Sequence, residues 1–266
     1  MNTFIEIKTP FPSLKTVKLA ESDTFRPAAT GDNEDQIRLK TLMEALEIQA
    51  SVDRESGFVS SAAHVERDAA IENAEREANE RISVAAWWAF DRPILGKASD
   101  ADIAAMHEKY DVPSDYHFAI GFVETVMRDG YAAVSILENA QTYPYIVLGA
   151  SFHEDKGVAA EKAFVESTQS WAASVWEKEQ GQKLGLWDIA ELRRRLLLIE
   201  QAPVIGGLRQ VIVASAPSTH LEVDQFPDGY VAWVYAHQFV SGRTASLARL
   251  AMKANESYYT YTEHNQ

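Results

Sequence analysis

Residues 77–81 read Glu77-Ala78-Asn79-Glu80-Arg81, and this run is the first indication of the kind of site that the chain carries. It lies within a predicted helix over residues 66–89, which ends before Pro93. On a helix, residues three and four apart share a face, so the two carboxylates lie one turn apart and Arg81 lies one turn beyond Glu77. Oxygen ligands gathered in this way suit a hard cation such as Mg²⁺.

Two other predicted helices repeat this spacing of oxygen donors. Glu44 and Glu47 form one pair, and Glu166 and Gln169 form the other. Lys40 and Lys162 lie one turn before these pairs, on the same helix faces. If the three faces converge, their carboxylates can hold Mg²⁺ while the basic groups hold phosphates. The same spacing is also typical of solvated helix faces, so that alternative stays open.

The order of the predicted elements indicates an α+β fold, with long helices packed on a mostly antiparallel sheet, in a single domain over residues 1–266. A strand-like start and a polar connector fill residues 1–34, and Asn33 with Gln36 resembles a capping box for the next helix. The 66–89 helix has a stripe rich in small residues, which predicts close packing against a sheet or a helix. This stripe consists of Ile71, Ala74, Ala78, Ile82 and Ala85.

The clearest strand signal comes from residues 118–127 and 131–138, which flank Asp129-Gly130. This dipeptide is typical of two-residue hairpin turns. Further helices are expected at 100–110 after Ser99, 154–178, 186–200 and 244–255, and further strands at 145–148, 210–214 and 230–240.

Composition limits the class of protein. The chain has 266 residues, no cysteine and a formal charge of −14, so disulfides, iron–sulfur clusters, thiolate zinc sites and cysteine nucleophiles are excluded. The negative charge argues against non-specific nucleic-acid binding, which needs basic patches. The run Arg193-Arg194-Arg195 favours a solvated helix face or a partner contact. No secretory signal or membrane-spanning apolar stretch is visible, so a cytoplasmic protein is expected.

Three segments, taken in order, form a more specific pattern than any single pair. Residues 41–47 read TLMEALE, residues 61–88 run from SAAH through the 77–81 motif to Trp87-Trp88, and residues 149–169 read GASFHEDKGVAAEKAFVESTQ. In this order they resemble the core of YcaO-family proteins, in which a G-A-S-type turn leads into the third helix. The two tryptophans are expected in the core.

The resemblance implies a mixed α/β domain that uses ATP and Mg²⁺ to activate a backbone amide of a ribosomally made peptide. The products in the family are azolines, thioamides or amidines, through cyclodehydratase or thioamidation chemistry. The resemblance further implies a precursor peptide as substrate, a ThiF-like or TfuA-like partner protein that delivers it, and room for a homo-oligomer. It implies these metal ligands: Glu44, Glu47, Glu77 and Glu80. The same four residues, together with Arg81, Lys162, Glu166 and Gln169, form the expected nucleotide-binding set.

The chain also departs from the family pattern. Ile48 replaces the arginine of the first motif, and Gly31-Asp32 stands roughly where a Gly-Lys-Gly run is expected. Ala69 replaces a residue that is often acidic, although Asp68 is adjacent. The final residues, SYYTYTEHNQ, lack the proline-rich ending of azoline-forming members. These departures support an alternative, in which the chain is a non-catalytic YcaO-like scaffold subunit of a peptide-modification complex.

Overall fold

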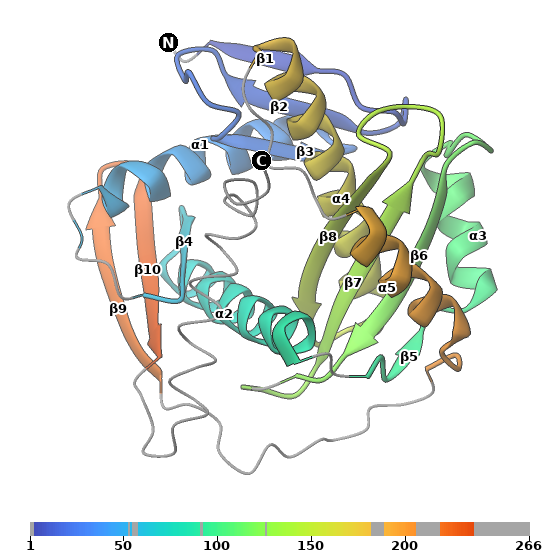
Figure 1. The fold of residues 1–266 in the computed structure, drawn as a ribbon. Helices are drawn as coiled ribbons and strands as arrows, with labels where there is room; N and C mark the ends of the chain where they lie inside the picture. The colour runs from blue at the N-terminus through green and yellow to red at the C-terminus, as the bar shows by residue number, and fades with distance from the viewer. Residues whose placement is uncertain are drawn as a thin grey trace, which may run out of the picture.

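The computed structural model describes residues 3–52, 54, 58–90, 93–125, 127–181, 189–205 and 219–236. They form three antiparallel sheets and five helices in a mixed α/β arrangement, which confirms the predicted fold class (Figure 1). None of the described helices is both long enough and apolar enough to cross a membrane.

The first sheet has the order β1-β2-β3 and supports α1. Its elements are β1 (Phe4–Ile7), β2 (Lys15–Leu19), β3 (Ala28–Gly31) and α1 (Glu34–Ser51). The Asn33 side chain accepts a hydrogen bond from the backbone N–H of Gln36, as the predicted cap requires. Thr41 of α1 donates to the carbonyl oxygen of Val17 at 3.1 Å, which fastens the helix to β2. The prediction of a polar connector is therefore wrong for the residues of β2 and β3.

The second sheet has the order β4-β10-β9 and packs against α2. Its elements are β4 (Ser60–His64), β9 (Thr219–Phe226), β10 (Gly229–Ala236) and α2 (Arg67–Phe90). Ala70, Ala74 and Ala78 of α2 are completely buried, because side chains of one carbon let the helix approach the sheet closely. The predicted small-residue stripe is confirmed.

The third sheet has the order β5-β6-β7-β8 and is covered on both faces. Its elements are β5 (Gly96–Lys97), β6 (His117–Val123), β7 (Tyr131–Glu138), β8 (Ile146–His153), α3 (Asp100–Lys109), α4 (Lys156–Glu179) and α5 (Ile189–Gln201). Phe164 of α4 packs against Phe118 on one face, and Ile199 of α5 joins Val134 in the cluster on the other. Because both faces are buried, β6 and β7 are apolar along nearly their whole length.

The predicted two-residue turn at Asp129-Gly130 is wrong. Strand β6 ends at Val123 and pairs it with Ala132 of β7, so the connection is longer than two residues. The side chain of Asn79 on α2 accepts a hydrogen bond from the backbone N–H of Met127 at 3.1 Å. A buried amide that binds this loop holds the longer connection against α2.

The predicted G-A-S-type turn is also wrong, because Gly149, Ala150 and Ser151 lie inside β8. They pair with Ser135, Val134 and Ala133 of β7, so the strand continues to His153. Strand β9 is not among the predicted elements. The predicted strand at 210–214, the helix at 244–255 and residues 237–240 lie outside the described residues.

Arg195 is not on a solvated face, which corrects the prediction for the basic run. Its side chain is 3% exposed and pairs with Glu191 at 2.6 Å. The guanidinium lies over the rings of Trp87 and Trp88, at 4.4 and 4.3 Å from their centroids. It also donates to the carbonyl oxygen of Trp88 at 2.9 Å. Burial of this cation is tolerated because it has an ion pair, a hydrogen bond and two ring faces. Trp87 is 2% exposed, as expected for a core residue.

Candidate functional site

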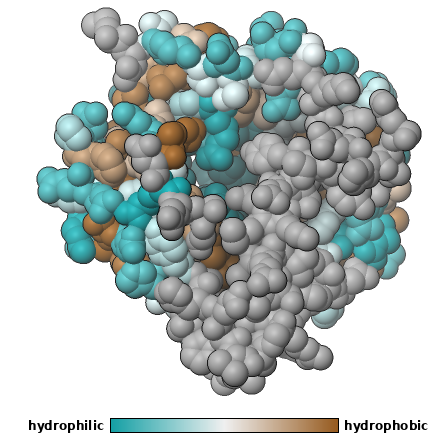
Figure 2. Space-filling view, turned by 60° about the vertical axis from the view of Figure 1, so that its left-hand side comes forward, coloured by the Kyte–Doolittle hydropathy of each residue, from teal (hydrophilic) through white to brown (hydrophobic). Residues whose placement is uncertain are grey.

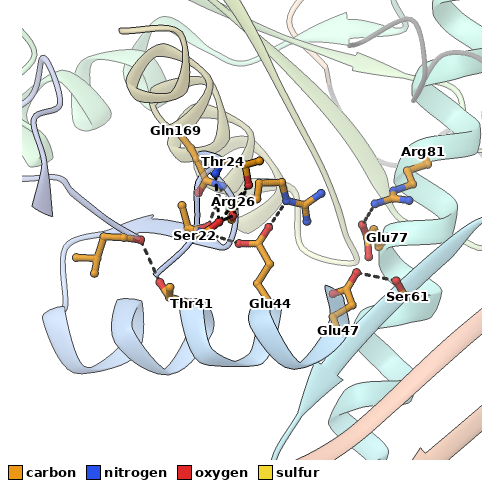
Figure 3. A network of polar contacts seen from close by, with 12 residues as sticks. Ser22, Thr24, Arg26, Thr41, Glu44, Glu47, Ser61, Glu77, Arg81 and Gln169 are labelled. Atoms are coloured by element: carbon orange, nitrogen blue, oxygen red, sulfur yellow. Dashed lines mark hydrogen bonds and ion pairs between the residues drawn. The ribbon is translucent and has the colours of Figure 1, made fainter. Parts of the chain in front are cut away.

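The three helices that carry the acidic pairs lie around one central region of the molecule. Helix α1 follows the first sheet, α2 follows β4, and α4 follows β8 (Figure 1). The close-up shows Glu44 and Glu47 of α1 on the side of that helix that faces Glu77 of α2 (Figure 3). The structure therefore brings the predicted pairs together from three separate parts of the chain.

Glu44 is held by groups outside its own helix. Its Oε1 forms an ion pair with Nε of Arg26, and its Oε2 accepts a hydrogen bond from the backbone N–H of Ala28 at 2.6 Å. The carbonyl oxygen of the same residue, Ala28, accepts a hydrogen bond from Nε2 of Gln169 at 3.2 Å. One peptide segment of β3 thus links a predicted ligand on α1 to a predicted ligand on α4.

Glu47 faces Ser61 of β4 and the acidic pair of α2. The Ser61 hydroxyl donates to Oε1 of Glu47 at 2.6 Å. Burial raises the pKa of Glu47 to about 8, and the Glu77 carboxylate acts in the same direction, while the bond from Ser61 opposes it. The free protein therefore holds a proton on Glu47 at neutral pH.

Glu77 and Glu80 differ in how their charges are compensated. Glu77 forms an ion pair with Arg81, whose guanidinium also donates to the carbonyl oxygen of Val59 at 3.1 Å. Burial raises the pKa of Glu80 well above its ordinary value, and Glu166 and Glu77 add to this effect. No hydrogen-bond or ion-pair partner is found for the Glu80 carboxylate within the described residues.

Helix α4 contributes Glu166 and Lys162 to this region, and these two residues are called the α4 wall of the site. Burial raises the pKa of Glu166 to about 7, with Glu44 acting in the same direction. Burial also lowers the pKa of Lys162, together with Lys40 and Arg76. Water nevertheless reaches both side chains, which are exposed. Both side chains are therefore partly surrounded by protein and still accessible to water. Figure 2 shows hydrophilic residues around a recess on one face of the molecule.

Several residues of this region fall outside the predicted set. Arg26 and Ser61 bind Glu44 and Glu47 directly, and Arg76 lies near Lys162 while pairing with Glu154 at 2.9 Å. Helix periodicity reveals neighbours on the same helix only, so it cannot reveal contacts made by β4 or by the loop before β3. Ile48, which stands where the resemblance predicts an arginine, is 39% exposed.

The donor set fits a magnesium–phosphate ligand in its chemistry. It offers carboxylate and amide oxygens together with basic side chains, and no sulfur. In the described residues, no three carboxylates or imidazoles lie close enough together to hold a metal ion. Two of the carboxylates, Glu44 and Glu77, have arginine partners instead. A cation that binds here must therefore draw the side chains together.

The raised pKa of Glu47 predicts that the free protein loses stability as pH rises. The folded state keeps a proton on Glu47 up to about pH 8, whereas the unfolded state loses it near its ordinary value of 4.5. Stability therefore falls between these two values and stays low above pH 8. We expect Glu47→Gln to gain roughly 1–2 kcal/mol over the wild type at pH 8.5, and little at pH 4.

Urea unfolding at the two pH values, with EDTA present, measures this difference. The glutamine keeps an oxygen that can accept the hydrogen bond from Ser61, so the substitution changes mainly the charge. Identical pH dependence in the variant and the wild type would show that Glu47 is already ionised in the folded protein.

Comparisons with known proteins agree with this arrangement at the level of the fold. No protein-family model matches the chain, and no curated protein sequence does. Among solved structures, the YcaO protein from Methanopyrus kandleri, bound with AMPPCP and Mg²⁺, is similar with a TM-score of 0.65 and 12% identity, over 88% of this chain and 84% of that chain. A chain of the E. coli microcin synthetase McbBCD complex is similar with a TM-score of 0.56 and 11% identity, over 88% of this chain and 86% of that chain. The chain therefore has a YcaO-type fold, which confirms the predicted resemblance for the fold.

Proposed function

We propose that the chain binds ATP with Mg²⁺ between α1, α2 and α4, and uses it in the modification of a peptide. The observation that carries the proposal is that the predicted acidic residues of α1, α2 and α4 lie in one region together with Lys162. A YcaO protein with the same fold is bound with AMPPCP and Mg²⁺, which supports this choice of ligand.

In this proposal the metal ligands are Glu44, Glu47, Glu77 and Glu80. The electrostatics support this role, because burial and the charge of Glu77 disfavour the ionised forms of Glu47 and Glu80 until a cation neutralises them. The remaining nucleotide-binding residues are Arg81, Lys162, Glu166 and Gln169. Among these, Lys162 is suited to a phosphate because its neighbours Lys40 and Arg76 add positive charge to its surroundings.

The proposed reaction activates a backbone amide of a ribosomally made peptide. An amide oxygen is a poor leaving group, and the nucleotide would supply the phosphoryl group that makes it a better one. The work of this chain is to position the phosphates and to offset their charge with Lys162, Arg81 and the bound cation. The product is an azoline, a thioamide or an amidine, according to the nucleophile that follows.

The proposal includes a partner protein that delivers the peptide, of a ThiF-like or TfuA-like kind. We further propose that residues 1–266 form one domain and that the protein acts in the cytoplasm. The structural neighbour from E. coli belongs to a microcin synthetase complex, which supports action within an assembly. The alternative is a non-catalytic scaffold subunit, and it is favoured by the exposed Ile48 in place of the family's arginine.

Calorimetric titration with AMPPCP tests the proposal, with Mg²⁺ and then with EDTA. We expect a Kd between about 1 µM and 1 mM with Mg²⁺, the range in which enzymes usually hold their substrates, and no measurable heat with EDTA. Binding that is unaffected by EDTA would contradict the role of the carboxylates. No binding in either condition, with candidate partner proteins also present, would leave the scaffold alternative.

A further inference from the structure

The helices α2 and α4 are preceded by the same local structure. Strand β4 ends at His64 and strand β8 ends at His153, and each helix begins three residues later, at Arg67 and Lys156. Both helices contain 24 residues. Each packs on its own strand and on the antiparallel neighbour of that strand, which is β10 for α2 and β7 for α4.

The acidic pairs lie at the same distance from the two histidines. Glu77 lies thirteen positions after His64 and Glu166 thirteen positions after His153, and three more positions lead to Glu80 and Gln169. The buried alanines of the two helices also lie at equal distances along the chain from the two histidines. Ala70 matches Ala159, Ala74 matches Ala163, and all four are completely buried.

The strands that pair with the two histidines also match. Tyr230 of β10 lies opposite His64, and Tyr131 of β7 lies opposite His153. An Asp-Gly dipeptide precedes each tyrosine, at 228–229 and 129–130. A Cβ on Gly229 would lie 2.7 Å from the carbonyl oxygen of His64, and one on Gly130 would lie 3.0 Å from that of His153. At both positions a side chain would crowd the carbonyl of the paired histidine, and at Gly130 it would also meet Cζ of Phe152 at 2.4 Å.

Each histidine ring holds the turn between its strand and its helix. Nδ1 of His64 accepts a hydrogen bond from the backbone N–H of Glu66 at 3.0 Å, and Nδ1 of His153 accepts one from Asp155 at 2.9 Å. A ring nitrogen that accepts carries no proton. For His153, burial together with Lys162 and Arg76 lowers the pKa and favours this neutral ring, although Glu154 and Asp155 act in the opposite direction.

We infer that the α2 and α4 walls of the site are two copies of one strand–histidine–helix unit, and that His64 and His153 are the positioning residues that set where each acidic pair lies. The inference rests on the proposed function only for the identity of the ligand. In Figure 1 the two units lie on opposite sides of the central region, with β4, β9 and β10 on one side and β6 to β8 on the other.

The two copies differ in charge, and this difference divides their roles. The α2 copy has Glu80 where the α4 copy has the neutral Gln169, and it has Asn73 where the α4 copy has Lys162. The α2 wall is therefore the stronger site for a cation, while the α4 wall suits the anionic phosphates. Loss of His64 should raise the Mg²⁺ concentration that binding requires. Loss of His153 should weaken nucleotide binding even at saturating Mg²⁺.

Alanine and asparagine variants of each histidine test the inference. Alanine removes the acceptor, whereas the asparagine oxygen can accept from the N–H two residues on. Hydrogen exchange at the amides of Glu66 and Asp155 should speed up about fivefold to tenfold in the matching alanine variant, and return towards the wild-type rate with asparagine. The affinity for Mg²⁺–AMPPCP should fall about tenfold with alanine and recover to within about threefold with asparagine.

His117→Ala is the matched control, because this exposed histidine pairs with Glu200 and lies at the start of β6. It should leave both readouts unchanged. Wild-type exchange and affinity in both alanine variants, or no recovery with asparagine, would overturn the positioning roles. If the wild type does not bind nucleotide, the proposed function fails, and the exchange measurement alone decides the role of the histidines.

Discussion

Gly149→Ala is expected to destabilise the fold by about 3 kcal/mol or more. A Cβ on Gly149 would lie 2.1 Å from the backbone nitrogen of Ser167, 2.3 Å from the carbonyl oxygen of Ala163 and 2.7 Å from the carbonyl carbon of Glu166. These atoms belong to the backbone of α4 and cannot rotate away, so the whole helix must move off β8.

Urea unfolding and nucleotide titration measure the two consequences of Gly149→Ala. The second consequence is a displaced Glu166, and hence weaker binding of Mg²⁺–AMPPCP in whatever fraction stays folded. Gly157→Ala is the control on the same helix, because the nearest atom to a Cβ on Gly157 would be Oδ1 of Asp155, at 3.3 Å. It should change stability by less than about 1 kcal/mol. A stable Gly149→Ala protein would contradict the close packing of α4 on β8.

The double substitution Glu77→Gln/Glu80→Gln is expected to weaken binding of Mg²⁺–AMPPCP at least about 100-fold, or roughly 2.7 kcal/mol. The two amides keep the size of the carboxyl groups but remove both charges that would hold the cation. Stability should change little, because relief of the repulsion among Glu80, Glu77 and Glu166 offsets the loss of the ion pair between Glu77 and Arg81. A large loss of binding without a matching loss of stability distinguishes a ligand site from an ordinary solvated helix face.

Glu72→Gln/Glu75→Gln supplies the control for this measurement. These residues have the same spacing on the same helix, but they pair with Arg76 and Arg128. We expect nearly unchanged affinity, because these residues are not among the predicted ligands. Equal losses of affinity in the two double variants would mean that α2 acts only through its total charge, and the assignment of Glu77 and Glu80 as ligands would then be wrong.

The sequence predicts the helices of this site well, because their stripes repeat with the helical period over many residues. It predicts the convergence of Glu44, Glu77 and Glu166 only through the resemblance, since periodicity carries no information about other elements. The small residues of 149–151 suit a turn and a strand equally, and pairing with β7 decides between them. Burial of Arg195 depends on Trp87 and Trp88, which are distant in sequence.

The shared unit of α2 and α4 is visible in the sequence only when the histidines are aligned together with the acidic pairs. The acidic pairs alone suggest three equivalent helices. The contacts of Glu66 and Asp155 with the two imidazole rings separate α2 and α4 from α1, which begins at an asparagine cap instead.

The arginine partners of Glu44 and Glu77 give the site its own internal counter-ions. A metal ion that takes these two carboxylates releases Arg26 and Arg81 from their ion pairs. A metal–phosphate complex brings an anion that these guanidinium groups can bind, whereas a bare cation brings none. Binding is then an exchange of ion-pair partners, in which the carboxylates move from the arginines to the metal ion and the arginines move to the phosphates. This exchange favours a ligand that carries both signs of charge over either ion alone.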